Sequence, residues 1–317
     1  MYYVGIDLGG TNIVAGVLDE DYRMIGRAAI KTAMPRPAKE IIADMARAIV
    51  QATENAGVFL DNVDSIGIGT PGSVDRETGT VMYAGNLNFS NVRIVDEMRA
   101  ILHKERIFLE NDANAAAAGE YYAGHGRGKR SFMQITLGTG IGGGVISDGR
   151  MLIGFNGAGG ELGHTVIVEN GEQCTCGRKG CFEAYASATA LIRQTKAAMM
   201  SDPASKMWEI AGGLDRVDGR TPFDAAGSGD PTAREVVKQY LRYVACGITN
   251  MINIFQPEVL CIGGGICNQG DNLLLPIKQM VSLENFARNC NRQTDIKISS
   301  LGNDAGIIGA ALLCKLA

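Results

Sequence analysis

The sequence lacks the basic clusters and the long apolar runs that are typical of proteins that bind nucleic acid or span a membrane. Among its 317 residues, 30 Lys and Arg stand against 34 Asp and Glu, a net charge of −4. No run of Lys or Arg occurs, so the basic footprint of a phosphate-backbone partner is missing. No window approaches the ~18 apolar residues of a membrane span, and the opening MYYVGIDLGG has no basic leader. We therefore expect a cytoplasmic protein without nucleic-acid or membrane partners.

Two common phosphate-binding motifs and a disulfide framework are also absent. No GxxxxGK[ST] sequence occurs, and the glycines of 138–144 lead into a predicted strand rather than a helix, which excludes the P-loop and the dinucleotide fingerprint. Three of the eight cysteines cluster between residues 174 and 181. The other five are scattered among apolar residues, as reduced buried thiols are, so no disulfides are expected.

An internal repeat indicates two related lobes. The segment IDLGGTNIVAGVLD begins at Ile6 and the similar segment ITLGTGIGGGVISD begins at Ile135, an offset of 129 residues. Self-similarity at a fixed offset is typical of duplicated structural units. Each copy predicts a strand, a glycine turn and a second strand, over Tyr2–Leu8 and Asn12–Leu18 and then over Phe132–Leu137 and Gly144–Ser147.

Strands that alternate with helices complete the predicted fold. Counting the two strands of the first hairpin, the order is βββαβαβα; the hairpin is followed by strand Gly26–Thr32, helix Pro37–Asn55, strand Ser65–Gly69, helix Asn91–His103, strand Arg106–Glu110 and helix Ala113–Ala123. The second half predicts helix Pro231–Phe255, strands Glu258–Ile262 and Ile296–Leu301, and helix Ala305–Leu316. This is an α/β protein. We expect an N-terminal lobe at 1–114, completed by 303–317, and a second lobe at 115–302, with the ligand in the cleft between lobes.

The densest motif is ELGHTVIVENGEQCTCGRKGCFE, which runs from Glu161 to Glu183. His164, Cys174, Cys176 and Cys181 make the Cys₃His set that tetrahedral zinc favours, and four protein ligands close the site, so the predicted zinc is structural. A structural zinc knuckle does not need the carboxylates of Glu161 and Glu183, so their presence in the same motif indicates that a ligand binds there. They suit a small polyhydroxylated ligand.

Three glycine-rich turns are candidates for a nucleotide. Asp7 stands in an apolar strand, where a charge is costly unless a cation or donors meet it. The simple reading is a turn aspartate; the functional reading is a phosphate or Mg²⁺ site built from glycine amides. The second repeat offers a matching turn, and a third glycine run could be a tight loop or could receive adenine and ribose. The candidate nucleotide and phosphate residues are Asp7, Gly9, Gly10, Thr11, Asn12, Thr139, Gly140, Gly264 and Gly265.

Asp112 is the candidate catalytic base. It follows a predicted strand and precedes a helix, so it could serve as a helix N-cap. The carboxyl end of a strand beside an interlobe crevice is also where a general base is expected, and the two roles are compatible. Asn111 offers an amide to a substrate hydroxyl.

Together these motifs resemble the ROK family of sugar kinases and sugar-responsive repressors, and its bacterial glucokinase-like members in particular. The likeness runs through DLGGTN, GIGTPG, GNLNF, ENDANAAA, TLGTGIGGG, GGELGH, CTCGRKGCFE, IGGG and AGIIGAA, in this order along the chain. The resemblance implies an actin-like, ribonuclease-H-like fold, Asp112 as catalytic base, and zinc held by the four residues named above. It implies that the sugar is held by Asn86, Asn111, Glu161, His164 and Glu183. Phe89 and Ala190 depart from the family's frequent Trp and Gly, which bears on sugar preference.

The leading hypothesis is therefore an ATP- and Mg²⁺-dependent hexose 6-kinase, with glucose as its first candidate substrate. Mannose, N-acetylmannosamine or another hexose is the alternative. A sugar-sensing repressor would carry a helix-turn-helix before the kinase-like part, and here the first glycine turn begins at residue 9. A third hypothesis, an interaction module built on the zinc knuckle alone, would need a basic patch, which the sequence lacks. Family members are often dimers, so we expect a homodimer.

Overall fold

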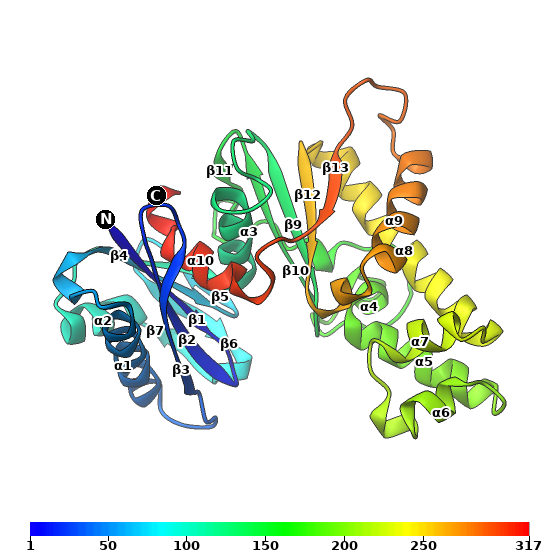
Figure 1. Ribbon diagram of the computed structural model, residues 1–317, viewed down its shortest axis with the longest axis horizontal. Helices are drawn as coiled ribbons and strands as arrows, with labels where there is room; N and C mark the ends of the chain where they lie inside the picture. Colours follow the sequence, from blue (N-terminus) through cyan, green and yellow to red (C-terminus); the bar gives the residue numbers. More distant parts are fainter. Residues whose placement is uncertain (317) are drawn as a thin grey trace. The chain divides into compact units, whose positions relative to one another are not determined.

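The computed structural model describes residues 1–316. Ala317, the last residue of the predicted 303–317 segment, lies outside the described residues. The chain forms two compact units, which are treated separately below (Figure 1). Unit 1 comprises residues 1–134, 144–160 and the segment from Ser300 to the end of the described residues, and unit 2 comprises residues 135–143 and 161–299.

Unit 1 is built on a five-stranded sheet with the order β3-β2-β1-β4-β8. Its strands are β1 (Tyr2–Leu8), β2 (Asn12–Leu18), β3 (Met24–Lys31), β4 (Val63–Thr70) and β8 (Ile107–Asn111). The first three are antiparallel, whereas β4 and β8 run parallel to β1. The strands β1 and β4 are almost wholly buried, as their continuous apolar runs predict, because helices cover both faces.

The helices of unit 1 lie on the two faces of this sheet (Figure 1). One face contacts α1 (Ala38–Ala56), which in turn packs on α2 (Ile94–Leu102); the other contacts α10 (Ala305–Ala311), which packs on α3 (Asp112–Tyr122). Helix α1 ends at Gly57, whose φ of 66° is the left-handed conformation that glycine adopts without strain. The core on this side is formed by residues such as Ile6, Ile42, Ile49 and Ile68.

A second, three-stranded sheet in unit 1 corrects the predicted order βββαβαβα. Strands β5 (Ser73–Asp75), β6 (Thr80–Ala84) and β7 (Phe89–Val92) form an antiparallel meander between β4 and α2. The predicted helix at Asn91–His103 therefore begins three residues later, because Asn91 and Val92 belong to β7, where Val92 pairs with Val81. The strands were missed because they are three to five residues long, too short for a clear alternating pattern.

The predicted repeat is confirmed by the second five-stranded sheet. Its order is β11-β10-β9-β12-β13, with β9 (Phe132–Leu137), β10 (Ile141–Ser147), β11 (Arg150–Met151), β12 (Val259–Gly263) and β13 (Asp295–Ile298). In each sheet a hairpin is extended by a third strand on one side, and by two strands on the other side of its first strand. The pair β12–β13 is parallel, as is β4–β8. The α/β fold class is likewise confirmed.

Six α-helices belong to unit 2. They are α4 (Glu183–Ala186), α5 (Ala188–Ser201), α6 (Met207–Ala211), α7 (Thr221–Gly227), α8 (Pro231–Phe255) and α9 (Asp271–Glu284). The bounds of α8 agree with the sequence prediction because both end signals are strong. The Asp230 side chain accepts a hydrogen bond of 2.7 Å from the Ala233 N–H, and Pro231 fills the first turn, where its missing N–H is not needed.

The compact units divide the chain elsewhere than the expected 114/115 boundary. Helix α3 and residues up to 134 belong to unit 1 because α3 packs closely on α10. A Cβ placed on Gly309 would lie 1.6 Å from the Ala115 carbonyl oxygen, so the two helix backbones meet where only glycine fits. Helix α10 ends at Ala311, short of the predicted Leu316.

Within residues 1–316, no helix combines the length and apolar character needed to cross a membrane.

Candidate active site and metal centre

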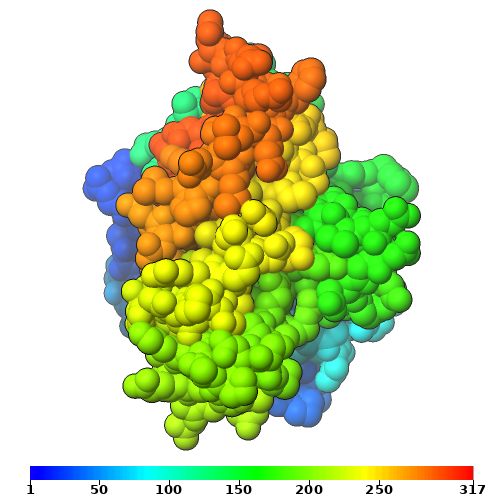
Figure 2. Space-filling model, turned by 90° about the vertical axis from the view of Figure 1, so that its right-hand side faces the viewer, coloured from blue at the N-terminus to red at the C-terminus, as the bar shows by residue number. Residues whose placement is uncertain are grey.

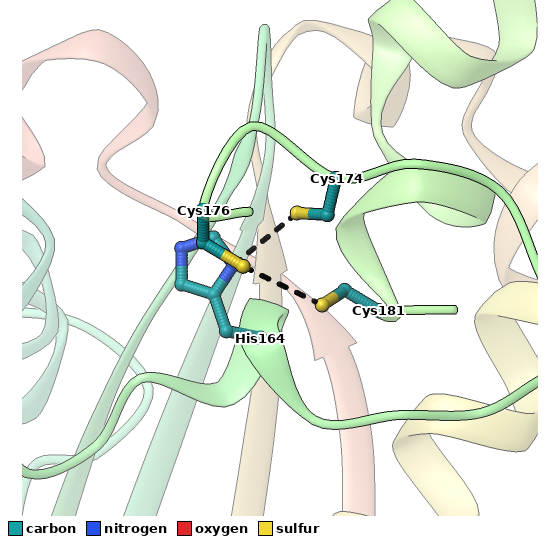
Figure 3. Close-up of side chains that lie close together, drawn as sticks. All are labelled: His164, Cys174, Cys176 and Cys181. Carbon is teal, nitrogen blue, oxygen red and sulfur yellow. Dashed lines mark hydrogen bonds between the residues drawn. The ribbon is translucent and has the colours of Figure 1, made fainter. Parts of the chain in front are cut away.

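The four predicted zinc ligands lie together in unit 2. His164 ends a short 3-10 helix (Leu162–His164), and the three cysteines come from the loop that follows. The ligand atoms of His164, Cys174, Cys176 and Cys181 all lie within 4.8 Å of one another. Figure 3 shows the imidazole and the three thiols turned toward one centre.

The geometry of this cluster fits a tetrahedral zinc ion. The Cys176 and Cys181 sulfurs are 3.7 Å apart, and His164 Nδ1 is 3.6 Å from the Cys174 sulfur. Zn–S bonds of about 2.3 Å place two tetrahedral sulfur ligands roughly 3.7 Å apart. Because Nδ1 faces the sulfurs, Nε2 of His164 stays available for a different partner. Gly177 and Gly180, with φ of 90° and 81°, form the tight knuckle.

Glu183 connects this cluster to the second glycine turn. Its Oε1 accepts a hydrogen bond of 3.0 Å from the Thr175 hydroxyl, within the cysteine loop. Its Oε2 accepts one of 2.9 Å from the Ile141 N–H, just after the turn. A Cβ on Gly140 would lie 2.3 Å from that same oxygen, so glycine is what lets the carboxylate rest on the turn. Hydrogen bonds of Glu183, a candidate sugar ligand, thus link the loop of the metal cluster to the second glycine turn, a candidate phosphate site.

Glu161 lies exposed at the start of the same 3-10 helix. Its carbonyl oxygen accepts a hydrogen bond of 3.1 Å from the His164 N–H, which ties the backbone of the two residues together. Leu162, between them, is buried and anchors the turn. A Cβ on Gly163 would lie 2.3 Å from the Ile141 carbonyl oxygen, so this segment also packs on the second glycine turn.

In unit 1 the junction between β8 and α3 carries Asn111 and Asp112. Asn111 is the helix cap: its Oδ1 accepts from the Ala113 N–H at 2.9 Å and from the Asn114 N–H at 3.3 Å. Its Nδ2 donates to the Gly72 carbonyl oxygen at 3.1 Å, which leaves one amide hydrogen for a ligand. Since Asn111 caps the helix, Asp112 is its first residue and its carboxylate is solvent-accessible.

The surroundings of Asp112 make it a stronger base than an ordinary carboxylate. Loss of hydration within the surrounding protein is the main cause that raises the pKa of Asp112, the hydrogen bond from the Ala113 N–H opposes the shift, and the nearby Asp7 charge adds to it, so that the resulting pKa is about 6. Burial also raises the pKa of Asp7 above its usual value. At neutral pH Asp112 remains mostly ionised and is able to accept a proton.

The first glycine turn holds Asn86 beside it. The Gly9 N–H donates to the Asn12 carbonyl oxygen at 2.9 Å and the Thr32 hydroxyl donates to the Gly9 carbonyl oxygen at 2.6 Å. A Cβ on Gly10 would lie 3.6 Å from the Asn86 carbonyl oxygen. Thr11 is exposed on the same turn. Thr32 shapes the turn and had no sequence signal beyond a hydroxyl at the end of a strand.

The second and third glycine turns meet in unit 2. The Gly138 N–H donates to the Gly140 carbonyl oxygen at 3.0 Å, and Thr139 is exposed between them. Gly264 has φ of 93°, and a Cβ there would lie 2.3 Å from the Leu137 carbonyl oxygen. Gly265 is exposed and has open space around it.

The predicted site residues therefore fall into two groups. Unit 1 brings together Asp7, the first glycine turn, Asn86, Asn111 and Asp112. Unit 2 brings together the zinc ligands, Glu161, Glu183 and the other two glycine turns. Sequence reasoning missed Thr175, which holds Glu183, and the buried pair of Arg76 and Glu110; a charged residue inside the apolar run IFLEN was the available signal for Glu110.

Unit 2 also has a groove between two of its helices. It has a volume of about 900 Å³ and runs between α5 and α8, on the face that Figure 2 presents in yellow-green and yellow. Tyr185 and Tyr243, whose ring centroids are 4.7 Å apart, are among the residues that line it. No predicted site residue is among those that line it.

Comparison with known proteins places this geometry in a family. The sequence matches the ROK family over residues 3–317. It is 37% identical to a glucokinase of Thermotoga maritima, over 98% of this chain and 96% of that protein. The structure of a ROK family glucokinase from Streptomyces griseus in complex with glucose and AMPPNP superposes with a TM-score of 0.82 at 33% identity, covering 99% of both chains. A xylose repressor of Caldicellulosiruptor bescii is 28% identical over 96% of this chain and 76% of the repressor.

Proposed function

The chain belongs to the ROK family and has its actin-like sugar kinase fold, and from that premise we propose that it is a glucokinase that transfers a phosphoryl group from ATP to the 6-hydroxyl of glucose. The observation that carries the proposal is Asp112, an accessible carboxylate with a raised pKa at the carboxyl end of β8. The greater identity to glucokinases than to repressors favours the enzyme. Mannose and N-acetylmannosamine remain the alternative substrates.

We assign the proton transfer to Asp112. Its carboxylate accepts the proton of the sugar 6-hydroxyl as that oxygen attacks the γ-phosphorus in line and ADP leaves. Backbone amides of the two hairpin turns, at Gly10, Thr11, Thr139 and Gly140, stabilise the phosphoryl charge. Mg²⁺, held near Asp7, would supply positive charge to the phosphates when bound. Most of the rate comes from positioning, because phosphoryl transfer asks little covalent chemistry of the protein.

We assign sugar recognition to side chains of both groups. Asn86 and the remaining amide hydrogen of Asn111 would bind hydroxyls beside Asp112. Glu161, His164 Nε2 and Glu183 would bind the other hydroxyls. Zinc in the Cys₃His cluster would be structural: it would fix the ring of His164 through Nδ1 and hold the loop that carries Thr175.

Cellular context is also part of the proposal. None of the eight cysteines, all of which lie within residues 1–316, forms a disulfide, which fits a reducing compartment such as the cytoplasm. A homodimer and a place in glycolysis rest on the family resemblance, and light scattering would test the dimer.

An ADP-release assay over a panel of sugars tests the proposed function. Wild type should release ADP with glucose, and the ratio of kcat/KM for glucose, mannose and N-acetylmannosamine should identify the substrate. Asp112→Ala is the matched inactive variant. An inert wild type, or an Asp112→Ala variant with full activity, would overturn the assignment.

A further inference from the structure

Glu110 is a buried carboxylate that no step of the proposed reaction uses. It is the next-to-last residue of β8, and its side chain is 3% exposed. Its Oε1 accepts hydrogen bonds from the Asn111 N–H at 2.8 Å and from Asn114 Nδ2 at 3.0 Å. Its Oε2 forms an ion pair with the Arg76 guanidinium, which is 26% exposed. The hydrogen bonds and the ion pair therefore connect the Glu110 carboxylate either to Asn111 and Asn114, on either side of Asp112 in the chain, or to Arg76.

Stability alone does not account for this arrangement. Removing two charges from water costs as much as their attraction returns, so an apolar pair of similar size is commonly as stable as a buried ion pair. Burial lowers the pKa of Arg76 to about 10, which leaves the guanidinium charged at neutral pH. The pair is therefore a specific, charged connection whose geometry matters more than its net energy.

The connection joins the two segments of unit 1 that carry its sugar candidates. Arg76 lies in the turn between β5 and β6, and Asn86 follows β6. A second link runs in parallel, from Asn111 Nδ2 to the Gly72 carbonyl oxygen just before β5. A Cβ on Gly72 would lie 2.0 Å from the Tyr83 carbonyl oxygen, so the start of β5 is packed directly on β6. The meander is therefore attached to the β8–α3 junction at two points, through Arg76 and through Gly72.

We propose that Arg76 and Glu110 are a positioning pair, which holds the β5–β6 turn against the β8–α3 junction and so sets Asn86 and Asn111 relative to Asp112. The inference rests on the proposed function. Neither residue touches the reacting atoms; each acts through the residues that do. Strand β8 lies at the edge of its sheet, so it has a neighbouring strand on one side only. The Glu110 carboxylate provides a hydrogen-bond acceptor for the Asn111 N–H of this edge strand.

The test uses kinetics of the full-length protein with glucose and ATP varied separately. Glu110→Gln keeps an oxygen for the Asn111 and Asn114 donors but removes the charge, and Arg76→Met removes the guanidinium. The double variant Arg76→Met/Glu110→Gln leaves no unpaired buried charge, so it separates folding from positioning. Arg106→Met is the matched control: Arg106 pairs with Asp64 at 2.8 Å and also links β8 to β4, but at the opposite end of the strands.

We expect the double variant to unfold near the wild-type temperature, with kcat lowered about 10- to 100-fold and the glucose KM raised, because small misplacements of reacting groups cost rates of this order. The ATP KM should stay within about twofold, and Arg76→Lys should recover part of kcat. Wild-type kcat and glucose KM in a folded Glu110→Gln or double variant would overturn the inference, as would equal losses in Arg106→Met. If wild type phosphorylates no sugar, the proposed function fails instead.

Discussion

At the scale of single residues, the proposed chemistry depends on Asp112, and the pKa of its carboxylate leads to a prediction for the pH dependence of the rate. A raised pKa means that the base is lost to protonation as the pH falls through about 6. We expect kcat/KM for glucose, which reports the free enzyme, to be level above pH 7 and to fall on the acid side with a midpoint near 6. Rates measured from pH 5 to 8 check this; an acid limb that begins only near the ordinary aspartate pKa of about 4 would contradict it.

Asp112→Asn should keep the fold and lose most of the rate. The amide has nearly the same shape but cannot accept the proton, and loss of a general base costs about 10²–10⁴-fold in kcat. Asn111 supplies the cap of α3, so the helix does not depend on the Asp112 charge. Thermal unfolding and the glucose KM should change little. A loss confined to KM would mean that Asp112 binds sugar without catalysing transfer.

The clustering of His164 with the three cysteines, and the position of Asp112 between a strand and a helix, could be predicted from the sequence because each lies in a compact motif. Arg76 and Thr175 could not, because their partners are distant in the chain and only the fold brings them together. Glu183 was predicted as a sugar ligand, but its bond to the Ile141 N–H depends on how Gly140 packs, which no spacing records.

At the scale of elements, the second glycine turn should depend on having no side chain at Gly140. A Cβ there would meet the end of the Glu183 side chain rather than backbone, so Gly140→Ala should fold normally while moving the carboxylate. Losing a charged hydrogen bond costs about 1.5–3 kcal/mol, so we expect the glucose KM to rise roughly 10- to 100-fold. Gly227→Ala is the control, since nothing lies within 4 Å of its Cβ. Unchanged kinetics in Gly140→Ala would remove Glu183 from sugar binding.

The contact of α3 with α10 predicts a different outcome at Gly309. A Cβ there would meet backbone, the Ala115 carbonyl oxygen, which cannot step aside. Overpacking of this kind costs about 1–3 kcal/mol or more, so Gly309→Ala should lower the unfolding midpoint clearly, relative to the same Gly227→Ala control. A midpoint equal to wild type would show that the helices have room to separate.

In the proposed function, zinc held by the Cys₃His cluster would couple metal binding to sugar binding through Glu183 and His164. Cys176→Ser removes one ligand, and we expect it to lose zinc, measured by elemental analysis, together with glucose affinity, measured by calorimetry. Ser201→Ala, on the exposed end of α5, is a control that should keep both. Normal glucose binding by a zinc-free Cys176→Ser protein would refute the coupling.

At the scale of the whole molecule, the duplicated sheet was predictable and the division into units was not. The repeat at Ile6 and Ile135 announced both hairpins, because their alternating glycine and aliphatic residues are local. The place of α3 depends on Gly309 and Ala115, which are distant in sequence and meet only after folding. The β5–β7 meander was hidden for the related reason that its short strands are stabilised by pairing with each other rather than by their own pattern.

The central claim is that the chain moves a phosphoryl group from ATP to the 6-hydroxyl of glucose, with Asp112 as base. The most direct measurement is glucose 6-phosphate formation, followed through glucose-6-phosphate dehydrogenase and compared with ADP released, for wild type and Asp112→Ala. We predict one glucose 6-phosphate for each ADP in wild type and a rate at least about 10²-fold lower in the variant. ADP release without glucose 6-phosphate, or equal rates in the two proteins, would contradict the claim.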